Sequence, residues 1–435
     1  MDIQELTKVY KSIGLFVKLC EIPSPSLKEE KLSREILKIF EDNSIKAQYD
    51  SYKNIIALIP ASKGCEEVPP LLLSAHMDVV GGSDEVNIML SEDDAFIETD
   101  KTRTLGADNK AGVAAILDLA INIANPKKNI PHGPIEITFT RDEETNMSGI
   151  HHLNTFRLNS KYAIICDGES LGELDNEGAS FTNIYIKVHK GKGGHSGINI
   201  DDTTRVSAVK IISELDSQIP QGVWKQDERG VITSINAGVI VGGSANTYFA
   251  ENIKEVYELA QAGKPIPAEY SAKNILDAIN KKAALNIISS EAQAAYSLRS
   301  SEPENEQELI GEIKEVVNTL NEKYYGFIKI DLEVKQHLKP FVKSKDRFLT
   351  NVIIEAGKKQ NLNVKEKSFH AGAETHVLSN GKTNSSGEKF VPVLIGLANI
   401  ENMHSPDEKM DWQSFLSGRK WLQDIVVTFA EKSGK

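Results

Sequence analysis

The stretch IEITFTRDEETNMSG, residues 135–149, joins an apolar β-like run to three consecutive acids, Asp142, Glu143 and Glu144. By itself such a charge run is typical of a solvent-exposed turn. The neighbouring segments place it in a repeating pattern. Apolar β-like runs also occupy residues 54–60, 69–80 and 162–169, and an Ala-rich helix is predicted at 109–124. Strands that alternate with helices predict an α/β domain with a mostly parallel central sheet flanked by helices.

The pattern changes in the middle of the chain. Residues 181–191 alternate apolar and polar side chains, as a strand with one solvent-exposed face does. The predicted elements that follow are helix, strand, strand, helix and strand, which completes the β-α-β-β-α-β order of ferredoxin-like domains. The α/β pattern returns near residue 343. We therefore predict one α/β domain from residues 1–179 and 343–435, interrupted by an inserted α+β domain at 180–342.

Two further segments are less regular. Residues 1–45 predict two helices joined at EIPSPSLKEE, where Ser24 or Ser26 is placed to cap the second helix. Residues 248–289, within the inserted domain, are lysine-rich and partly helical in pattern, and no function is assigned to them.

Composition excludes several classes of protein. The 435 residues are 40% hydrophobic and 26% charged, which is ordinary for a globular protein, and the formal net charge is −12. A negative chain without a basic stripe predicts no nucleic-acid partner. No run is long enough to span a membrane and no signal peptide is recognisable, so we expect no membrane partner and a cytoplasmic location. The three cysteines contain no CxxC pair, so any metal is expected on oxygen and nitrogen ligands.

Chemistry-bearing residues recur where the predicted strands end. His76 and Asp78 lie two residues apart on one strand and so point to the same face. Asp78 is placed to accept a hydrogen bond from a metal-bound His76, although a lone histidine is more often structural. Asp108 opens the predicted helix at 109–124, where N-capping is the simpler interpretation. Asp167 ends a strand, and His404 lies in the loop after another one.

Ligands of α/β sheets bind beyond the carboxyl ends of the strands, where these residues are expected to meet. Two imidazoles and three carboxylates suit a pair of divalent metal ions, most simply Zn²⁺, with Co²⁺ or Mn²⁺ as alternatives. One acid then remains. Because adjacent residues of an extended chain point apart, one of Glu143 and Glu144 can bind metal while the other faces the bound water as a base.

Eight short motifs support this interpretation by their order. They are HMDVV (76–80), GADNKAG (106–112), DEET (142–145), CDGE (166–169), KGKGGHSG (190–197), GGSANT (242–247), LRSS (298–301) and MHSPDE (403–408). Each motif is weakly specific alone. In this order they resemble, over nearly the whole chain, the two-zinc exopeptidases that include peptidase T, the aminoacyl-histidine dipeptidases, carboxypeptidase G and the aminoacylases.

The resemblance implies a role for each residue of the cluster. His76 and Asp167 are expected to bind one zinc, Glu144 and His404 the other, and Asp108 to bridge them. It makes Glu143 the catalytic base. Asp78, the expected acceptor of the His76 ring N–H, is also grouped with the catalytic residues. The resemblance also implies a cis peptide bond between Asp108 and Asn109, and it makes the inserted domain a lid and a possible homodimerisation surface.

Substrate contacts are also implied. The Gly-rich loop GKGGHSG lacks the GK[ST] that a phosphate site would need. The resemblance implies instead that its His195 stabilises the oxyanion. Arg299 is expected to bind a substrate carboxylate, although a surface arginine is the simpler interpretation without the family. Asn246 matches a family asparagine near the same group, but the proline that commonly follows is absent. His370 and Glu374 occupy a pocket loop and are candidates for binding a substrate amino terminus.

These expectations define a di-zinc exopeptidase that acts on di- or tripeptides, most simply an aminopeptidase similar to peptidase T. The same chemistry also suits an N-acyl amino acid deacylase or a carboxypeptidase, and residues of the substrate pocket would decide between them. A metal-binding relative without turnover is the alternative from another class, but neither the base, nor a ligand, nor the lid histidine is missing here. A phosphohydrolase would need a cluster of Arg and Lys near the ligands.

Overall fold

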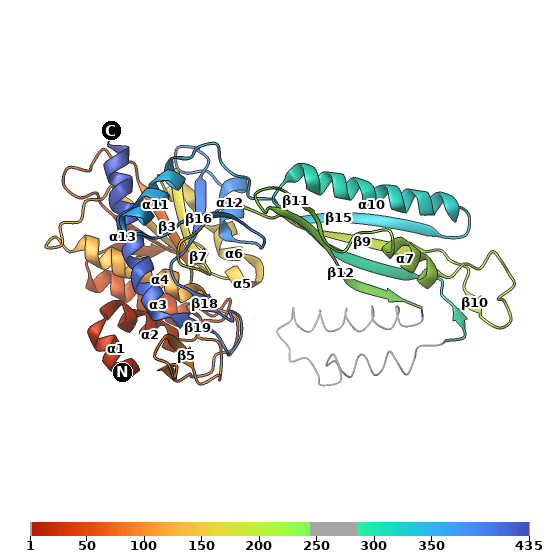
Figure 1. Cartoon of the computed structure of the whole chain (residues 1–435), viewed down its shortest axis with the longest axis horizontal. Coiled ribbons are helices and arrows are strands. Elements are labelled where there is room, and N and C mark those ends of the chain that lie inside the picture. The colour runs from red at the N-terminus through yellow and green to blue at the C-terminus, as the bar shows by residue number, and fades with distance from the viewer. Residues whose placement is uncertain (1, 244–284, 435) are drawn as a thin grey trace. The chain divides into compact units, whose positions relative to one another are not determined.

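The computed structural model describes residues 2–243 and 285–434, and these fall into two compact units (Figure 1). The first unit consists of residues 1–178 and 341–435, and the second of residues 179–340. The chain therefore leaves the first unit once, builds the second and returns.

An eight-stranded sheet forms the centre of the first unit, with the strand order β1-β2-β6-β3-β7-β17-β8-β16. The pairs β3–β6, β3–β7, β7–β17 and β8–β16 are parallel, whereas β1–β2, β2–β6 and β8–β17 are antiparallel. The mostly parallel sheet flanked by helices confirms the predicted α/β class. The strands are β1 (Lys46–Tyr49), β2 (Ile55–Ile59), β3 (Leu71–His76), β6 (Ile135–Thr140), β7 (Tyr162–Gly168), β8 (Glu173–Gly178), β16 (Lys365–Phe369) and β17 (Val391–Gly396).

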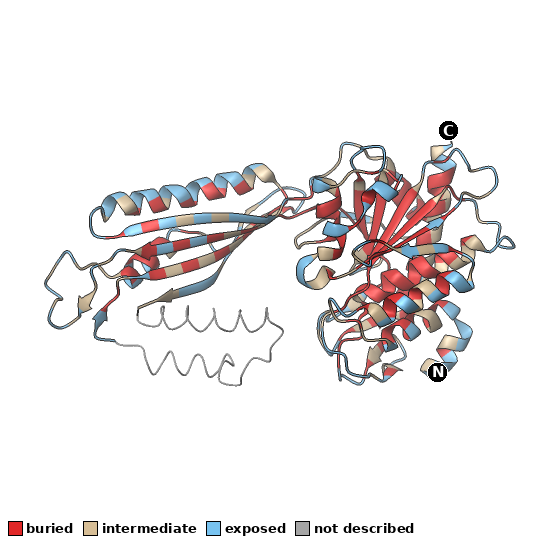
Figure 2. Ribbon diagram, turned by 180° about the vertical axis from the view of Figure 1, so that it is seen from behind, coloured by how far each residue is buried: buried red, intermediate tan, exposed pale blue. Residues whose placement is uncertain are grey.

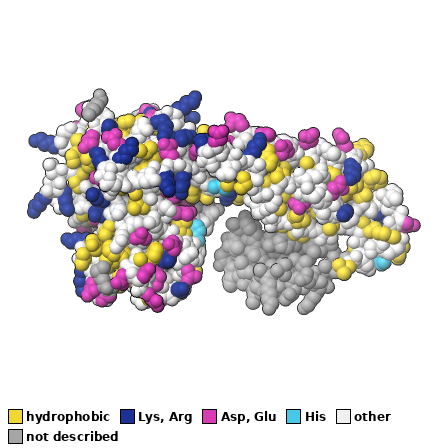
Figure 3. All heavy atoms as spheres, viewed as in Figure 1, with side chains coloured by type: hydrophobic (Ala, Val, Ile, Leu, Met, Phe, Trp, Pro, Cys, Tyr) yellow, Lys and Arg dark blue, Asp and Glu magenta, His cyan; other side chains and the backbone are white. Residues whose placement is uncertain are grey.

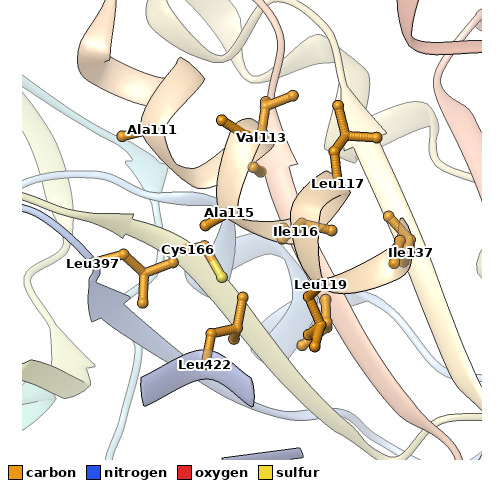
Figure 4. Packing of buried hydrophobic residues seen from close by; sticks show 14 of the residues in the cluster. Ala111, Val113, Ala115, Ile116, Leu117, Leu119, Ile137, Cys166, Leu397 and Leu422 are labelled. Atoms are coloured by element: carbon orange, nitrogen blue, oxygen red, sulfur yellow. The ribbon is translucent and has the colours of Figure 1, made fainter. Parts of the chain in front are cut away.

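Helices cover this sheet and share one apolar core with it. These helices include α1 (Ile3–Val9), α2 (Lys11–Glu21), α3 (Glu30–Asp42), α4 (Ala107–Ala124), α11 (Phe348–Lys359) and α13 (Trp412–Ser433). Figure 4 shows side chains of α4 packed with those of β6, β7 and α13. Each fully buried Leu or Ile contributes about 1.5–3 kcal/mol. The core therefore fixes α4 against the sheet, and with it the turn at the start of α4.

The first 45 residues differ from the prediction. They form three helices rather than two, and neither Ser24 nor Ser26 caps α3, whose N-cap is Glu29 without a side-chain cap. The Ser24 hydroxyl donates to the backbone oxygen of Met77 at 2.8 Å, and the Ser26 hydroxyl donates to Asp78 Oδ2 at 2.7 Å. Both serines therefore satisfy acceptors that follow β3, which no local pattern reveals.

The second unit is a five-stranded antiparallel sheet with the order β11-β12-β14-β9-β15. Its chain order is β9 (Phe181–His189), α7 (Ala208–Asp216), β11 (Gly222–Gln226), β12 (Ile232–Gly242), β14 (Ala292–Ser300), α10 (Pro303–Lys323) and β15 (Lys329–Leu338). Without the edge strand β11, which was not predicted, this is the ferredoxin-like arrangement. Buried and more exposed residues alternate along β9 and β14, whereas β3 and β6 are buried throughout (Figure 2).

Two small sheets complete the described fold. The strands β10 (Gly194–His195) and β13 (Ile287–Ile288) pair in the second unit. In the first unit the order β18-β19-β5-β4 joins β18 (Ile400–Glu401), β19 (Lys409–Asp411), β5 (Phe96–Thr99) and β4 (Ile88–Leu90). This sheet was not predicted, and it supports the loop 402–408, which carries His404.

Charged side chains of both signs are interspersed over the face of the molecule in Figure 3. Some form ion pairs, such as Lys161 with Asp346 at 2.7 Å and Lys343 with Glu366 at 3.0 Å. Such partly exposed pairs contribute at most about 1 kcal/mol each. None of the helices in residues 2–243 and 285–434 combines the length and the apolar composition that crossing a membrane requires.

Candidate metal centre and active site

The predicted ligands meet at one edge of the large sheet. His76 is the last residue of β3, and Asp167 is the last residue but one of the parallel neighbour β7. Glu143 and Glu144 begin the short helix α5 (Glu143–Asn146), which starts three residues after the end of β6. Asp108 lies in the first turn of α4. Carboxyl ends of parallel strands share an edge, so residues far apart in the sequence come together there.

Two groups of ligand atoms share Asp108. His76 Nε2 lies 3.2 Å from Asp108 Oδ1 and 3.2 Å from Asp167 Oδ1. His404 Nε2 lies 3.0 Å from Asp108 Oδ2 and 3.1 Å from Glu144 Oε2. Asp108 thus presents one oxygen to each imidazole, which is the arrangement that a bridging carboxylate requires.

The donor set fits divalent cations. Ligand atoms of His76, Asp108 and Glu144 lie within 4.8 Å of one another, and all of them are nitrogen or oxygen. Glu144 Oε1 is buried and has no hydrogen-bond partner among the described residues. A buried carboxylate oxygen without a donor is costly unless a cation faces it. The residues therefore form a potential binding group for metal ions.

Electrostatics at the two histidines favour positive charge. Burial alone would lower the pKa of His76, but the negative charge of Asp167 and the contacts with Asp108 and Asp167 outweigh it and raise the pKa well above its usual value. The contact with Asp108 raises the pKa of His404 to about 9. The same negative potential attracts a metal cation.

The carboxylates show the cost of crowding. Burial raises the pKa of Asp167 to about 6 and that of Glu144 to about 8. Burial would also raise the pKa of Asp108, but its contacts with His404 and His76 hold it well below the usual range. Several carboxyl groups this close together cannot all carry charge unless cations compensate them.

Asp78 orders the residues around the cluster. Its carboxylate accepts the backbone N–H of Glu143 at 2.9 Å and that of Glu144 at 3.1 Å, together with the Ser26 hydroxyl. The expected contact with His76 takes a different form. His76 Nδ1 lies 2.9 Å from the backbone oxygen of Asp78 and 3.5 Å from its Oδ1, so the carbonyl is the nearer acceptor. Asp78 thus connects the β3 and β6 sides of the cluster.

Substituting Asp78 with alanine is expected to weaken cation binding by about 10- to 100-fold, the usual effect of removing a group that orients metal ligands. The reason is that the backbone of both glutamates loses its acceptor. Titration of the metal-free protein with Co²⁺ measures the change. Ser26→Ala removes a single donor to Asp78 and is expected to have a smaller effect; equal affinities in Asp78→Ala and the native protein would contradict the role.

Glu143 is the acid left over by the ligand groups. Burial raises its pKa well above the usual value, and the nearby charges of Asp167 and Glu144 raise it further against the opposing effect of His76. A carboxylate can accept a proton and release it again, as a general base must.

The turn before α4 explains the glycines of GADNKAG. Gly106 has φ +75°, and a Cβ there would lie 2.8 Å from Val79 Cγ1. Gly112 permits a closer approach, since a Cβ there would lie 2.1 Å from the backbone oxygen of Cys166. The expected cis bond between Asp108 and Asn109 is present.

The second unit carries the other expected contacts. His195 is exposed on β10, and its Nδ1 accepts the backbone N–H groups of Gly197 at 3.1 Å and Ile198 at 3.2 Å. If Nδ1 is the acceptor, the neutral ring carries its proton on Nε2, which lies 3.3 Å from the side-chain amide nitrogen of Asn286. Arg299 stacks over the Phe181 ring at 4.7 Å, and its Nη1 is buried without a partner among the described residues. Asn246 lies outside the described residues.

Of the remaining candidates in the first unit, Glu374 is the first residue of α12 (Glu374–Gly381) and His370 precedes this helix. Glu374 is 1% exposed, and the Ser74 hydroxyl lies 3.4 Å from its Oε2. Burial raises the pKa of Glu374 to about 7. His370 is half-buried in the loop before this helix. Sequence reasoning assigned no role to Glu408, although it belongs to the MHSPDE motif, and it missed the contact of Ser26, for which no signal exists in the sequence.

Residues 72–428 match the peptidase family M20/M25/M40. Among curated relatives, an uncharacterised protein, YqjE, from Bacillus subtilis is 27% identical over 264 residues, 59% of this chain and 67% of the relative. The cytosol non-specific dipeptidase of Escherichia coli is 31% identical over 42% of each chain. Peptidase T of Clostridium novyi is 29% identical over 46% of this chain and 55% of its own. The chain thus spans between 42 and 67% of these relatives.

Solved structures share the fold over nearly the full length. Aminopeptidase PepT from Bacillus cereus has a TM-score of 0.76 at 21% identity, covering 96% of this chain and 98% of that one. A tripeptidase from Staphylococcus aureus gives 0.76 at 22%, covering 97% and 98%. The YXEP protein of Bacillus subtilis, described as a dinuclear metal-binding peptidase, gives 0.66 at 13%, covering 97% and 98%. The family match covers most of the chain, and the fold agrees with it. The chain therefore belongs to peptidase family M20/M25/M40.

Proposed function

We propose that this protein is a metallo-exopeptidase that hydrolyses di- and tripeptides, most simply from the amino end. The observation that carries the proposal is the shared carboxylate of Asp108, which faces His76 on one side and His404 on the other. The names of the relatives, peptidase T and non-specific dipeptidase, support small peptides as substrates. The name of the Escherichia coli relative also supports a cytosolic location, which remains a prediction.

In this proposal His76 and Asp167 hold one cation, Glu144 and His404 hold the other, and Asp108 bridges them. Zn²⁺ is the first choice because its preferred ligands are of these types, with Co²⁺ and Mn²⁺ as alternatives. The chemistry supplied by two bound cations is Lewis-acid activation of water and of the scissile carbonyl. The YXEP protein, which has the same fold and is described as dinuclear, supports a site for two cations.

Glu143 moves the protons. Its carboxylate accepts a proton from the attacking water and delivers it to the leaving amine, for which its raised pKa is suited. Asp78 accepts the backbone N–H of Glu143 and so fixes the position of the backbone from which the catalytic carboxylate extends. His195 donates from Nε2 to the oxyanion that forms at the scissile carbonyl, a contribution of about 2.7–4 kcal/mol for one such donor in other enzymes.

Arg299 binds the carboxylate of the peptide substrate in this proposal. Its Nη1 is a buried donor with no partner among the described residues, and its guanidinium plane is held over Phe181. Glu374, His370 and Asn246 stay candidates for contacts with the two ends of the substrate. The second unit would act as a lid, and homodimerisation through it remains a prediction.

The test is a panel of free tripeptides and dipeptides, a C-amidated tripeptide and an N-acetyl amino acid, with the protein loaded with Zn²⁺, Co²⁺ or Mn²⁺. We expect cleavage of free peptides at the amino end. Because a hydrogen bond to a charged group is worth about 1.5–3 kcal/mol, amidation and Arg299→Gln should each lower kcat/KM by roughly 10- to 100-fold. Amidation should add little loss in Arg299→Gln, since both changes remove the same interaction.

Other results would point elsewhere. Cleavage of the acetylated compound alone would identify a deacylase, and release of carboxyl-terminal residues a carboxypeptidase. Two bound cations without cleavage of any compound would favour a metal-binding protein without turnover. Phosphatase activity in the metal-loaded protein would favour the phosphohydrolase alternative instead.

A further inference from the structure

Glu408 is a buried carboxylate in the same loop as His404. It lies four residues after that histidine, directly before β19, and it is 1% exposed. No ligand role is assigned to it above. A buried carboxylate needs hydrogen-bond donors to be stable. The identity of its donors shows what Glu408 does.

Three donors among the described residues reach Glu408, and all of them belong to residues 104–108, the turn that carries Asp108. Glu408 Oε2 accepts the backbone N–H of Gly106 at 2.7 Å and the Thr104 hydroxyl. Its Oε1 accepts the backbone N–H of Asp108 at 3.1 Å. The two oxygens therefore bind a turn of the chain some 300 residues earlier in sequence.

This turn begins α4 and has no cap of its own. The N-cap position is Gly106, which has no side chain to accept the free N–H groups of the first turn. Glu408 supplies the missing acceptor from another part of the chain. Negative charge near a helix N-terminus is favourable, so a carboxylate suits this place better than a neutral group.

The other ties between the His404 loop and this region are weaker. Lys101 and Asp407 form an ion pair at 2.7 Å, but both side chains are exposed. The Thr99 hydroxyl reaches the backbone oxygen of Pro406 only at 3.4 Å. An exposed pair contributes at most about 1 kcal/mol. Among these contacts, those of Glu408 thus include the buried hydrogen bonds that connect the His404 loop with residues 104–108.

We propose that Glu408 is a positioning residue that sets the distance between Asp108 and His404 and thereby the affinity for the cation held by His404, Asp108 and Glu144. Glu408 accepts the backbone N–H of one metal ligand, Asp108, and belongs to the same loop as another, His404. The proposal rests on the metal centre of the proposed function. Because it concerns cation affinity, it does not depend on any substrate.

The test compares Glu408→Gln with Glu136→Gln. Glu136 is also a buried carboxylate that accepts backbone N–H groups, from Asn159 at 2.8 Å and Ser160 at 3.0 Å, but it lies at the start of β6, at the end opposite to Glu143. Titration of both metal-free variants with Co²⁺ and Zn²⁺ gives the two cation affinities, and thermal unfolding gives their stability. The Co²⁺ absorption spectrum reports the ligand geometry.

In Glu408→Gln an amide N–H₂ replaces one acceptor and faces N–H donors. We therefore expect the cation held by His404, Asp108 and Glu144 to bind about 10- to 100-fold less tightly, with an altered Co²⁺ spectrum. Glu136→Gln should lose stability with unchanged cation affinities. Glu408→Asp, which keeps the charge but shortens the side chain, is expected to recover part of the affinity. If native protein binds two cations but cleaves no peptide, the proposed function fails while this comparison still decides the role of Glu408.

Cation affinities within twofold of the native protein in Glu408→Gln would overturn the proposal, because the residue would then only stabilise the fold. Where Glu408→Gln fails to fold, Thr104→Val provides the second variant. It removes one donor to Glu408 and keeps the carboxylate and its two backbone contacts. We expect a loss of cation affinity of a few-fold, and an unchanged affinity in this variant would contradict the proposal as well.

Discussion

Replacing Glu143 with glutamine is expected to lower kcat for a free tripeptide by about 100- to 10,000-fold, the range that general acid–base catalysis contributes. Glutamine keeps the size of the side chain and the backbone contact with Asp78. It cannot take a proton from water or return one to the leaving amine. The measurement is kcat and KM at saturating Zn²⁺, together with the metal content of the variant.

The adjacent residue provides the matched control. Glu144→Gln changes a carboxylate that lies 3.1 Å from His404 Nε2, so its first effect should be a weaker cation affinity. Glu143→Gln should instead keep two cations and lose turnover. The two variants thereby separate the base from the ligand within one pair of glutamates. Turnover above a tenth of the native value in Glu143→Gln, with both cations bound, would contradict the assignment of the base.

The positions of these carboxylates were predictable because they depend on strand ends. An apolar run that stops at His76, at Thr140 or near Asp167 is visible in the sequence, and parallel strands bring their carboxyl ends together. The ferredoxin-like unit was predictable for a similar reason, since the alternation along β9 is a local signal. What the pattern could not supply was strand order, which depends on pairings between distant segments.

The contacts that orient the site were not predictable. Ser26 is of a residue type that commonly caps helices, yet its hydroxyl donates to Asp78, 52 residues away in the sequence. Glu408 sits in a recognisable motif, but its partners are 300 and 302 residues distant in sequence. Local rules favour local partners for Ser and Glu, and tertiary packing overrides them. The small sheet behind the His404 loop has strands of only two to four residues, too short for a periodic signal.

Replacing Gly112 with alanine is the second substitution with a large expected effect. The glycine lies in α4, where α4 passes the end of β7, and an added Cβ would lie 2.1 Å from the backbone oxygen of Cys166 and 2.3 Å from Asn109 Oδ1. Backbone cannot yield as a flexible side chain does. We expect the free energy of unfolding to fall by about 1–3 kcal/mol, as overpacking of a core usually costs, in spite of the better helix propensity of alanine.

The control for this substitution is Gly311→Ala in α10, where, apart from the adjacent residues and the helix's own backbone, no described atom lies within 4 Å of the added Cβ. There only helix propensity acts, and alanine is expected to stabilise the protein by about 0.5–1 kcal/mol. Chemical denaturation measures the change in the free energy of unfolding for both variants, which should have opposite signs. A Gly112→Ala protein as stable as the native one would show that α4 can move away from β7 without cost.

Gly112 also links packing to chemistry. It lies four residues after Asp108, and Cys166 immediately precedes Asp167, so the contact between them determines how closely these two carboxylates approach His76. Moving α4 outward by even a few tenths of an ångström separates Asp108 from Asp167. We therefore expect Gly112→Ala to weaken cation binding as well as stability, whereas Gly311→Ala should leave it unchanged. Weakened stability with native cation affinity would mean that the ligands adjust independently of the core beneath them.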